Sequence, residues 1–192
     1  MKTSKLVAVS VFVLVLFSSI GKREKKECVL TIDNYQTFYN FIRLDSVHYT
    51  QIILEGSFAN KAGVSSLNLD SFYHQLLKCK HLSYLEISNS HLKTIDERLL
   101  KLTTLRSLSL KENDIDSIPR QIKNLKKLFQ ISLRYNKLKS FSNLCDLSNL
   151  KFITLSNNSI LYIPANIVKL KNLRVIHLDR NCISELPCEL SF

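Results

Sequence analysis

The residue types that carry most enzyme chemistry are present in this chain but are not arranged for it. Its histidines are His48, His74, His81, His91 and His177. The nearest approach to a metal-ligand spacing is Cys79-Lys80-His81, which offers two ligands where a structural zinc site needs four. The sequence has no nucleophile elbow, phosphate-binding loop or HExxH motif. We therefore predict no enzyme activity, no metal site and no cofactor.

The side chains better suited to function are those that bind other macromolecules. Tyrosine and arginine are enriched at the energetic centres of protein interfaces, and Arg134-Tyr135 places both types next to each other. We predict a partner-binding patch from these two residues and five others spread widely along the chain. The patch consists of Tyr84, Lys111, Arg134, Tyr135, Phe152, His177 and Arg180.

A repeat accounts for how such distant residues could share one surface. Five segments fit the pattern LxxLxLxxNxL, and their starts lie 23, 23, 22 and 23 residues apart. They are Leu82–Leu92, Leu105–Ile115, Leu128–Leu138, Leu150–Ile160 and Leu173–Ile183. A fixed period of this length indicates structural units that stack on one another.

Each segment reads as a short strand followed by a sharp turn. Leu108 and Leu110 alternate with polar residues, which predicts a strand with one buried face. An asparagine follows in four segments, where its amide can bond to backbone groups left unpaired in the turn. We expect Asn113, Asn136, Asn158 and Asn181 to stack as a ladder between coils, and to take the unusual backbone angles of the turn. Ser90 holds this position in the first segment.

The other half of each unit must bring the chain back to start the next strand. Residues 118–127 and 163–172 share a proline followed by apolar residues three and six positions later, which suits a short helix. Residues 140–149 lack the proline and predict a looser helical or 3₁₀ turn. Because one coil cannot bury its own apolar side, the coils must stack, and Leu108, Ile131, Ile153 and Ile176 should lie side by side on neighbouring strands.

These motifs resemble the leucine-rich repeat family. The IPxxIxxLxx return segments are most similar to the subclass found in Ras-group scaffold proteins. The resemblance implies an α/β fold, a right-handed leucine-rich-repeat solenoid with a short parallel sheet on its concave face and short helices or 3₁₀ turns on its convex face. It also implies recognition of other proteins, without naming a partner.

The first 21 residues predict a secretory signal peptide. Lys2 and Lys5 precede an apolar run over residues 6–20, and Ser19 and Gly21 place small residues where a signal peptidase cleaves. The run is shorter than the roughly 20 residues of a comfortable membrane span. We expect cleavage after Gly21 and a secreted protein, with an uncleaved membrane anchor as the alternative.

Residues 22–81 are predicted to cap the array, and residues 82–192 to form five leucine-rich repeats, the last incomplete. The spacing of apolar residues over 33–44 predicts a capping helix, and residues 51–57 resemble a repeat strand. The region is therefore interpreted as a degenerate repeat behind a capping helix, since terminal units of arrays are atypical. An independent small domain is the alternative.

The net charge of +11 falls to +9 when Lys2 and Lys5 leave with the signal peptide, and part of the remaining excess is localised. Seven basic residues fall where return segments approach the next strand, and stacking would align them on one edge: Lys123, Lys126, Lys127, Lys151, Lys169, Lys171 and Arg174. Such an edge could attract an acidic protein, an anionic glycan or a lipid surface, or could serve only solubility. Nucleic acid is not expected, because no base-reading motif is present.

Secretion would permit disulfides, and the odd number of cysteines leaves at least one unpaired. The pairings Cys28 with Cys79 and Cys182 with Cys188 both remain open, and Cys145 is expected to be buried. Asn157-Asn158-Ser159 is a glycosylation sequon, so Asn157 is a candidate acceptor at the rim of the patch.

The sequence thus predicts a secreted protein that recognises another macromolecule through its concave face, without catalysis. The alternatives are a membrane-anchored repeat protein and a structural or coat component. Because the sequence stops at Phe192, within the fifth return segment, we also expect self-association through an uncapped C-terminal end.

Overall fold

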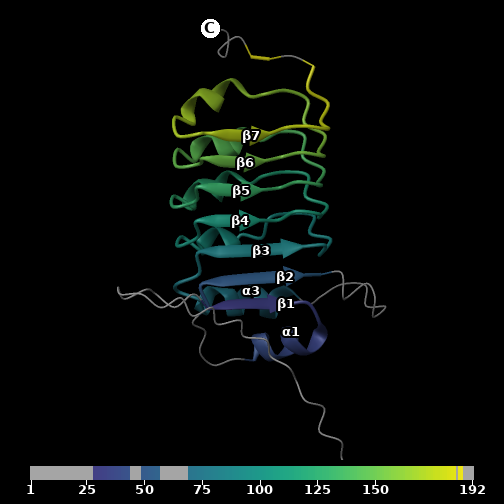
Figure 1. Cartoon of the computed structure of the whole chain (residues 1–192), viewed down its shortest axis with the longest axis vertical. Coiled ribbons are helices and arrows are strands. Elements are labelled where there is room, and N and C mark those ends of the chain that lie inside the picture. The colour runs from purple at the N-terminus through teal and green to yellow at the C-terminus, as the bar shows by residue number, and fades with distance from the viewer. Residues whose placement is uncertain (1–27, 44–48, 57–68, 185, 188–192) are drawn as a thin grey trace, which may run out of the picture.

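The computed structural model describes residues 28–43, 49–56, 69–184 and 186–187. Within them the chain winds into coils, and each coil adds one strand to a parallel sheet whose order follows the sequence (Figure 1). The strands are β1 Val29–Ile32, β2 Gln51–Glu55, β3 Tyr84–Ser88, β4 Ser107–Ser109, β5 Gln130–Ser132, β6 Phe152–Thr154 and β7 Val175–His177. The α/β solenoid architecture predicted from the sequence is confirmed.

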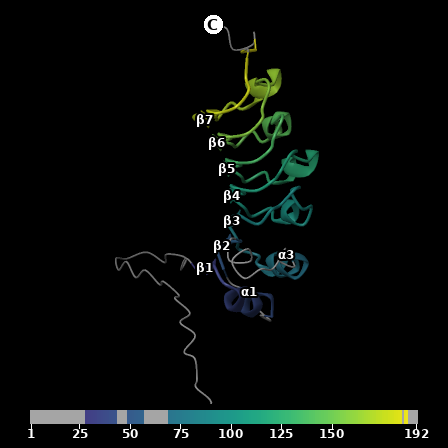
Figure 2. The same cartoon turned by 90° about the vertical axis from the view of Figure 1, so that its right-hand side faces the viewer.

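Helical segments form a second layer behind the sheet (Figure 2). They are α1 Tyr35–Ile42, α3 Leu69–Lys78, η1 Leu99–Lys101, η2 Arg120–Asn124, η3 Ser142–Asp146 and η4 Ala165–Lys169. The four η segments are 3₁₀ helices, and Pro119 and Pro164 stand directly before η2 and η4. The ring of proline fixes φ near a helical value and supplies no N–H that would need a partner there. The looser turn predicted over residues 140–149 is the 3₁₀ helix η3.

The core runs without a break between the two layers. Leu108 pairs with Ile131, Ile131 with Ile153, and Ile153 with Ile176, so the predicted row of aliphatic residues is confirmed. The first three are fully buried, and Ile176 packs half-buried against the core. At about 1.5–3 kcal/mol for each buried aliphatic side chain, stacking of these rows is the main stabilising term.

The sheet continues into the N-terminal part of the chain. The helix predicted over residues 33–44 is α1, and the strand predicted over 51–57 is β2, which pairs with β3 in parallel. Strand β1 was not predicted, because its four residues carry no repeat motif. Phe41 and Phe72, whose ring centroids lie 5.5 Å apart, pack α1 against α3 at this end of the stack.

The ladder asparagines tie each coil to the one before it. The Asn136 amide donates to the carbonyls of Leu110, in the preceding coil, and Leu133, at 2.9 and 3.1 Å, and its Oδ1 accepts from the Ile115 N–H at 2.9 Å. The same three kinds of bond recur at the other three ladder positions, with Asn113 receiving the N–H of Leu92. Buried backbone groups at every turn thereby find partners.

The unusual backbone angles fall one residue earlier than the sequence suggested. Glu112, Tyr135, Asn157 and Arg180, each directly before a ladder asparagine, have φ between 54° and 57°. The expectation that the asparagines themselves take the left-handed conformation is therefore wrong. The asparagines contribute through the side-chain amide, which both donates and accepts hydrogen bonds, and the residue before each of them adopts the left-handed backbone conformation of the turn.

An arginine clasp joins α3 to the segment before η1. Arg98 donates from Nη2 to Asp70 Oδ1 at 2.8 Å and to Asp96 Oδ2 at 2.7 Å, and from Nε to Asp96 Oδ1 at 2.8 Å. Its guanidinium carbon lies 4.7 Å from the centre of the Tyr73 ring. The hydrogen bonds from Arg98 lower the pKa of Asp96 below its ordinary value.

We predict that Asn136→Ala lowers the free energy of unfolding by about 1–3 kcal/mol, because it leaves the buried Ile115 N–H without a partner and removes one of the two amide bonds that the Leu110 carbonyl accepts. Asn172→Ala is the control, since that amide makes an exposed bond to the Ser148 carbonyl, and it should cost under about 1 kcal/mol. Urea unfolding followed by circular dichroism measures both. Equal losses for the two variants would contradict the ladder's role.

Asp96→Asn should remove part of the protein's acid sensitivity. A carboxyl group with a lowered folded-state pKa stabilises the fold above its unfolded pKa of 3.8, and this contribution is lost as the pH falls through the folded value. The variant should therefore be about 1–2 kcal/mol less stable at pH 7 and lose less stability between pH 5 and pH 2. Parallel pH profiles of the two proteins would argue against the clasp.

Candidate binding face

The exposed side of the sheet consists of the strand residues that alternate with the core. We call it the strand face. One row across it is Tyr84, Ser107, Gln130, Phe152 and Val175, and the next is Glu86, Ser109, Ser132, Thr154 and His177. The next equivalent repeat position is held by Ser88, the last residue of β3, and by Lys111, Arg134, Ser156 and Asp179, each two residues after the end of its strand.

Arg134 and Tyr135 form a stacked pair at the end of β5. The guanidinium carbon of Arg134 lies 4.6 Å from the centre of the Tyr135 ring, and its Nη2 donates to the Tyr135 hydroxyl at 3.2 Å. Tyr135 is 41% exposed, so the pair presents aromatic surface and charge together. Each side chain restrains the other, which lowers the entropy that binding would cost.

An acidic side chain lies beside this pair. The Ser156 hydroxyl donates to Asp179 Oδ1, and this bond, together with the positive charge of Arg134, lowers the pKa of Asp179. Four of the predicted patch residues lie at the C-terminal ends of β5 and β7 or just after them. They are Arg134, Tyr135, His177 and the exposed Arg180.

Tyr84 and Lys111 belong to a separate network around Glu86. The Tyr84 hydroxyl donates to Glu86 Oε2 at 2.6 Å, and Lys111 Nζ lies 3.0 Å from Glu86 Oε1. Burial and the bond to Glu86 raise the pKa of Tyr84, and the same carboxylate raises that of Lys111. A partner would have to compete with these internal bonds, so both residues contribute less to a free binding surface than the sequence suggested.

Phe152 lies apart from Arg134. It begins β6, four residues before Ser156, which is the repeat equivalent of Arg134, so about 13 Å of strand separates the two positions. Phe152 instead neighbours Val175 of β7, and the two side chains are 36% and 39% exposed. The predicted patch is thus three groups, and Val175, whose side chain the alternation of β7 also places outward, joins Phe152 in the third.

The Asn157 side chain is turned inward at this end of the face. Its Nδ2 atom is buried and has no hydrogen-bond partner among the described residues. A glycan is attached through that atom, so modification of the folded chain would require the side chain to rotate outward. The predicted glycosylation of Asn157 would therefore have to precede the closure of this coil.

The cysteines behave as core or surface thiols in the described part of the chain. Cys28, Cys79, Cys145 and Cys182 are free, so the Cys28–Cys79 pairing is not formed, and Cys188 lies outside the described residues. Burial raises the pKa of Cys79 to about 12, which keeps its thiol protonated beside the exposed His81. No three His, Cys, Asp or Glu side chains among the described residues are grouped closely enough to hold a metal ion.

Of the seven basic residues expected on one edge, Lys123 and Lys169 lie in η2 and η4, and the other five lie in the turns that lead from the helical segments into the next strands. We call the seven the basic edge. Six of them are exposed, and Lys151 is half-buried. Lys101 and Arg106 hold the equivalent positions one coil earlier, and both are exposed. The sequence analysis missed these two, although the repeat alignment places them in register with Lys169 and Arg174.

A family model described as leucine rich repeat matches residues 80–138 and 103–160. The chain is a leucine-rich repeat protein. The matched region spans β3 to β6, where the strand, ladder and return positions are most regular. No curated protein matches the sequence.

Solved structures of other leucine-rich repeat proteins share this fold. An internalin C2 from Listeria monocytogenes superposes with a TM-score of 0.56 and 17% identity over 83% of this chain. A leucine-rich repeat protein of Leptospira interrogans superposes with a TM-score of 0.51 and is 20% identical in sequence over 81% of this chain. The chain spans 63% and 42% of the length of these two structures. Repeats of this family generally serve to bind other proteins.

Because Tyr135 has a left-handed backbone conformation, substitutions at this position of the leucine-rich repeat protein should differ in stability according to whether the new residue tolerates that conformation. Asparagine tolerates φ near 54° whereas a β-branched residue does not. We predict that Tyr135→Asn stays within about 0.5 kcal/mol of the wild-type free energy of unfolding, while Tyr135→Val loses about 1–2 kcal/mol. Chemical denaturation tests both. A loss for asparagine as large as for valine would mean that the ring, not the backbone, limits this position.

Proposed function

We propose that this leucine-rich repeat protein is exported and binds another protein through its strand face, with Arg134 and Tyr135 as the anchor. The observation that carries the proposal is the stacked pair itself, an exposed tyrosine held 4.6 Å from a guanidinium group. Tyrosine and arginine recur at interface hot spots because they offer large contact area, charge and hydrogen bonds from few rotatable bonds.

The surroundings of the pair suit a protein rather than a small molecule. Beside Tyr135 lies an open hollow of ≈ 560 Å³ lined by Asn89, His91, Glu112, Asn113 and Asp114. Phe152 and Val175 supply a second, apolar contact about 13 Å away along the strands. A partner that covers both clusters would span most of the strand face, which is the scale of a protein interface.

The charges near the anchor favour an acidic group on the partner. Arg134 is engaged by a neutral ring, and Arg180 is exposed beyond it. Asp179 is already bonded to the Ser156 hydroxyl. A carboxylate of the partner placed between Arg134 and Arg180 would gain two charge-assisted bonds while displacing none of the pairs described above.

Export is proposed from the first 21 residues, which lie outside the described part of the chain. None of the described helices is long and apolar enough to cross a bilayer. N-terminal sequencing of the protein recovered from its native source should begin at Lys22. Recovery of a membrane-bound chain that begins at Met1 would replace secretion with the anchored alternative and would leave the binding face unaffected.

Site-specific photocrosslinking tests the binding face. A benzophenone amino acid replaces Gln130, an exposed residue at the centre of the strand face, or Gln121, an exposed residue of η2 on the opposite layer. In the culture medium and extracts of the organism that makes the protein, the Gln130 probe should trap a defined protein, and Arg134→Ala or Tyr135→Asn should reduce the yield at least about fivefold.

The Gln121 probe is the matched control, because it replaces the same residue type on another surface. The same adduct from Gln121 with none from Gln130 would move the interface to the helical layer. A Gln130 adduct insensitive to both anchor substitutions would keep the face but remove the proposed anchor.

A further inference from the structure

The helical segments and the turns that lead from them into the strands carry an unbalanced charge. Four equivalent segments, residues 99–106, 122–129, 144–151 and 167–174, contain nine lysines and arginines and one acidic residue, Asp146. Lys169 pairs with this aspartate at 3.1 Å, and it is the one cation of these segments that forms an ion pair within the described residues. The basic edge therefore projects a field that the chain itself does not neutralise.

The opposite edge, where the strands end, is built differently. Asp114 accepts from Lys137 at 2.7 Å and from His91 at 3.3 Å, and Glu86 holds Lys111. Cations and carboxylates alternate there and compensate one another. The charge excess is thus a property of one edge rather than of the whole surface.

The repeat arranges these cations in lines along the stack. Arg106, Lys151 and Arg174 occupy one repeat position, and Lys126 and Lys171 occupy another. Neighbouring coils of a parallel sheet are about 5 Å apart, so four coils hold a narrow, straight strip of positive charge about 15 Å long.

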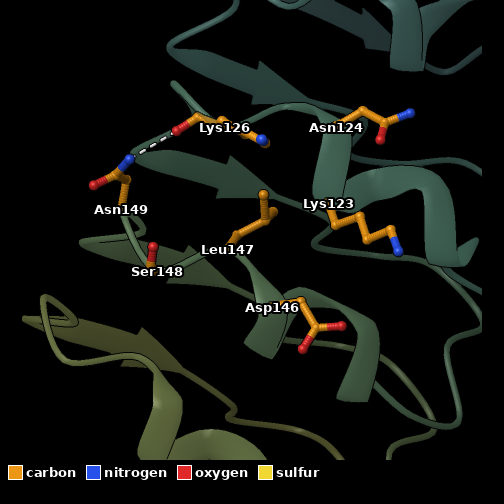
Figure 3. A pocket seen from close by; sticks show the side chains of 7 residues that line it. All are labelled: Lys123, Asn124, Lys126, Asp146, Leu147, Ser148 and Asn149. Carbon is orange, nitrogen blue, oxygen red and sulfur yellow. Dashed lines mark hydrogen bonds between the residues drawn. The ribbon is translucent and has the colours of Figure 1, made fainter.

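Shallow hollows between coils interrupt the strip. One, of ≈ 480 Å³, lies between η2 and η3 and is lined by Lys123, Lys126, Asp146 and Asn149, with the Asn149 amide bonded to the Lys126 carbonyl (Figure 3). Another, of ≈ 630 Å³, is lined by Lys101, Lys126 and Lys127 together with Thr103. Each hollow places ammonium groups next to uncharged polar groups, and the carboxylate of Asp146 in the first hollow is paired with Lys169.

The chemistry of the strip selects among anionic partners. Val168 is the one large apolar side chain exposed in the described residues of the four segments, so the strip lacks the apolar groups that hold a protein interface or enter a bilayer surface. Phe129 is its one aromatic residue and is half-buried, which leaves no platform for stacking nucleic-acid bases. A linear polymer with closely spaced strong anions and hydroxyl groups needs neither feature.

We propose that the basic edge binds a linear sulfated polysaccharide laid along the stack, in contact with Lys123, Lys126 and Lys151 and with the cations Arg106, Lys171 and Arg174 of the neighbouring coils. This surface is separate from Arg134 and Tyr135, so the chain can hold a polysaccharide and a protein partner at once. The protein would encounter such a polysaccharide in its native setting only if it is exported, as proposed above, but its ability to bind the polysaccharide does not depend on export.

The test uses the full chain and a fluorescent heparin dodecasaccharide, titrated at several salt concentrations. The triple variant Lys123→Gln, Lys126→Gln, Lys151→Gln should weaken binding at least about tenfold and flatten its salt dependence. The control Arg43→Gln, Lys93→Gln, Lys139→Gln removes the same charge from exposed positions elsewhere, and should change the affinity less than about twofold. Thermal unfolding of each variant verifies that it is folded.

Three results would overturn the proposal. Equal weakening by both triple variants would reduce the effect to net charge. Equal or tighter binding of a desulfated dodecasaccharide would remove the role of sulfate. Edge-dependent binding to phosphatidylserine vesicles or to single-stranded DNA, tighter than binding to heparin, would assign the edge to a membrane or a nucleic acid instead.

Discussion

Each coil leaves buried backbone groups at the turn after its strand, and the asparagine of the next coil satisfies them. The Asn136 side chain donates to the Leu110 carbonyl and accepts from the Ile115 N–H, both in the preceding coil, and its equivalents repeat this arrangement in each coil. An unpaired buried amide or carbonyl costs about 1–3 kcal/mol, so each coil is stabilised by the asparagine of the next one. Burial of the aliphatic rows drives the stacking, and the hydrogen bonds of the ladder fix the register of each coil against the next.

Both proposed surfaces follow from this locked register. Because the coils cannot slip, residues that share a repeat position lie in a line, whether they are Lys126 and Lys171 on the basic edge or Arg134 and Asp179 at the strand ends. The exposed residues of the strand face, among them Gln130 and Phe152, have no part in the ladder or the core. Such positions can change without loss of the fold, which is why a binding function suits this architecture better than chemistry that needs a deep site.

Much of the fold could be predicted from the sequence, because its cause is periodic. Leucine spacing predicts the buried rows, and asparagine spacing predicts the ladder. Strand β1 escaped prediction because four residues without a repeat neighbour carry no periodic signal. The left-handed angle fell on Tyr135 rather than Asn136 because the turn is set by hydrogen bonds between coils, which a single unit does not reveal.

The candidate site was harder to predict, since it depends on pairing and distance across coils. Periodicity places Tyr84 and Lys111 on the strand face but does not show that both are bonded to Glu86. It places Phe152 on the same face as Arg134, but it does not show how far apart the two residues lie along the strand direction. The inward amide of Asn157 is a side-chain rotamer, which no spacing rule reports.

Removal of one whole coil tests the central claim most directly, because a register-locked stack should tolerate the loss of a complete unit and nothing smaller. Deleting residues 128–149, the span from Leu128 to the residue before Leu150, lets Asn158 meet the coil of Leu110 as Asn136 did. We expect this shortened chain to keep strand and 3₁₀ signals in circular dichroism and to unfold in one cooperative step with a smaller denaturant dependence, whereas deletion of residues 128–138 alone should abolish folding. If the whole-coil deletion unfolded the chain as completely as the half-coil deletion, the coils would not be equivalent units held by a shared ladder.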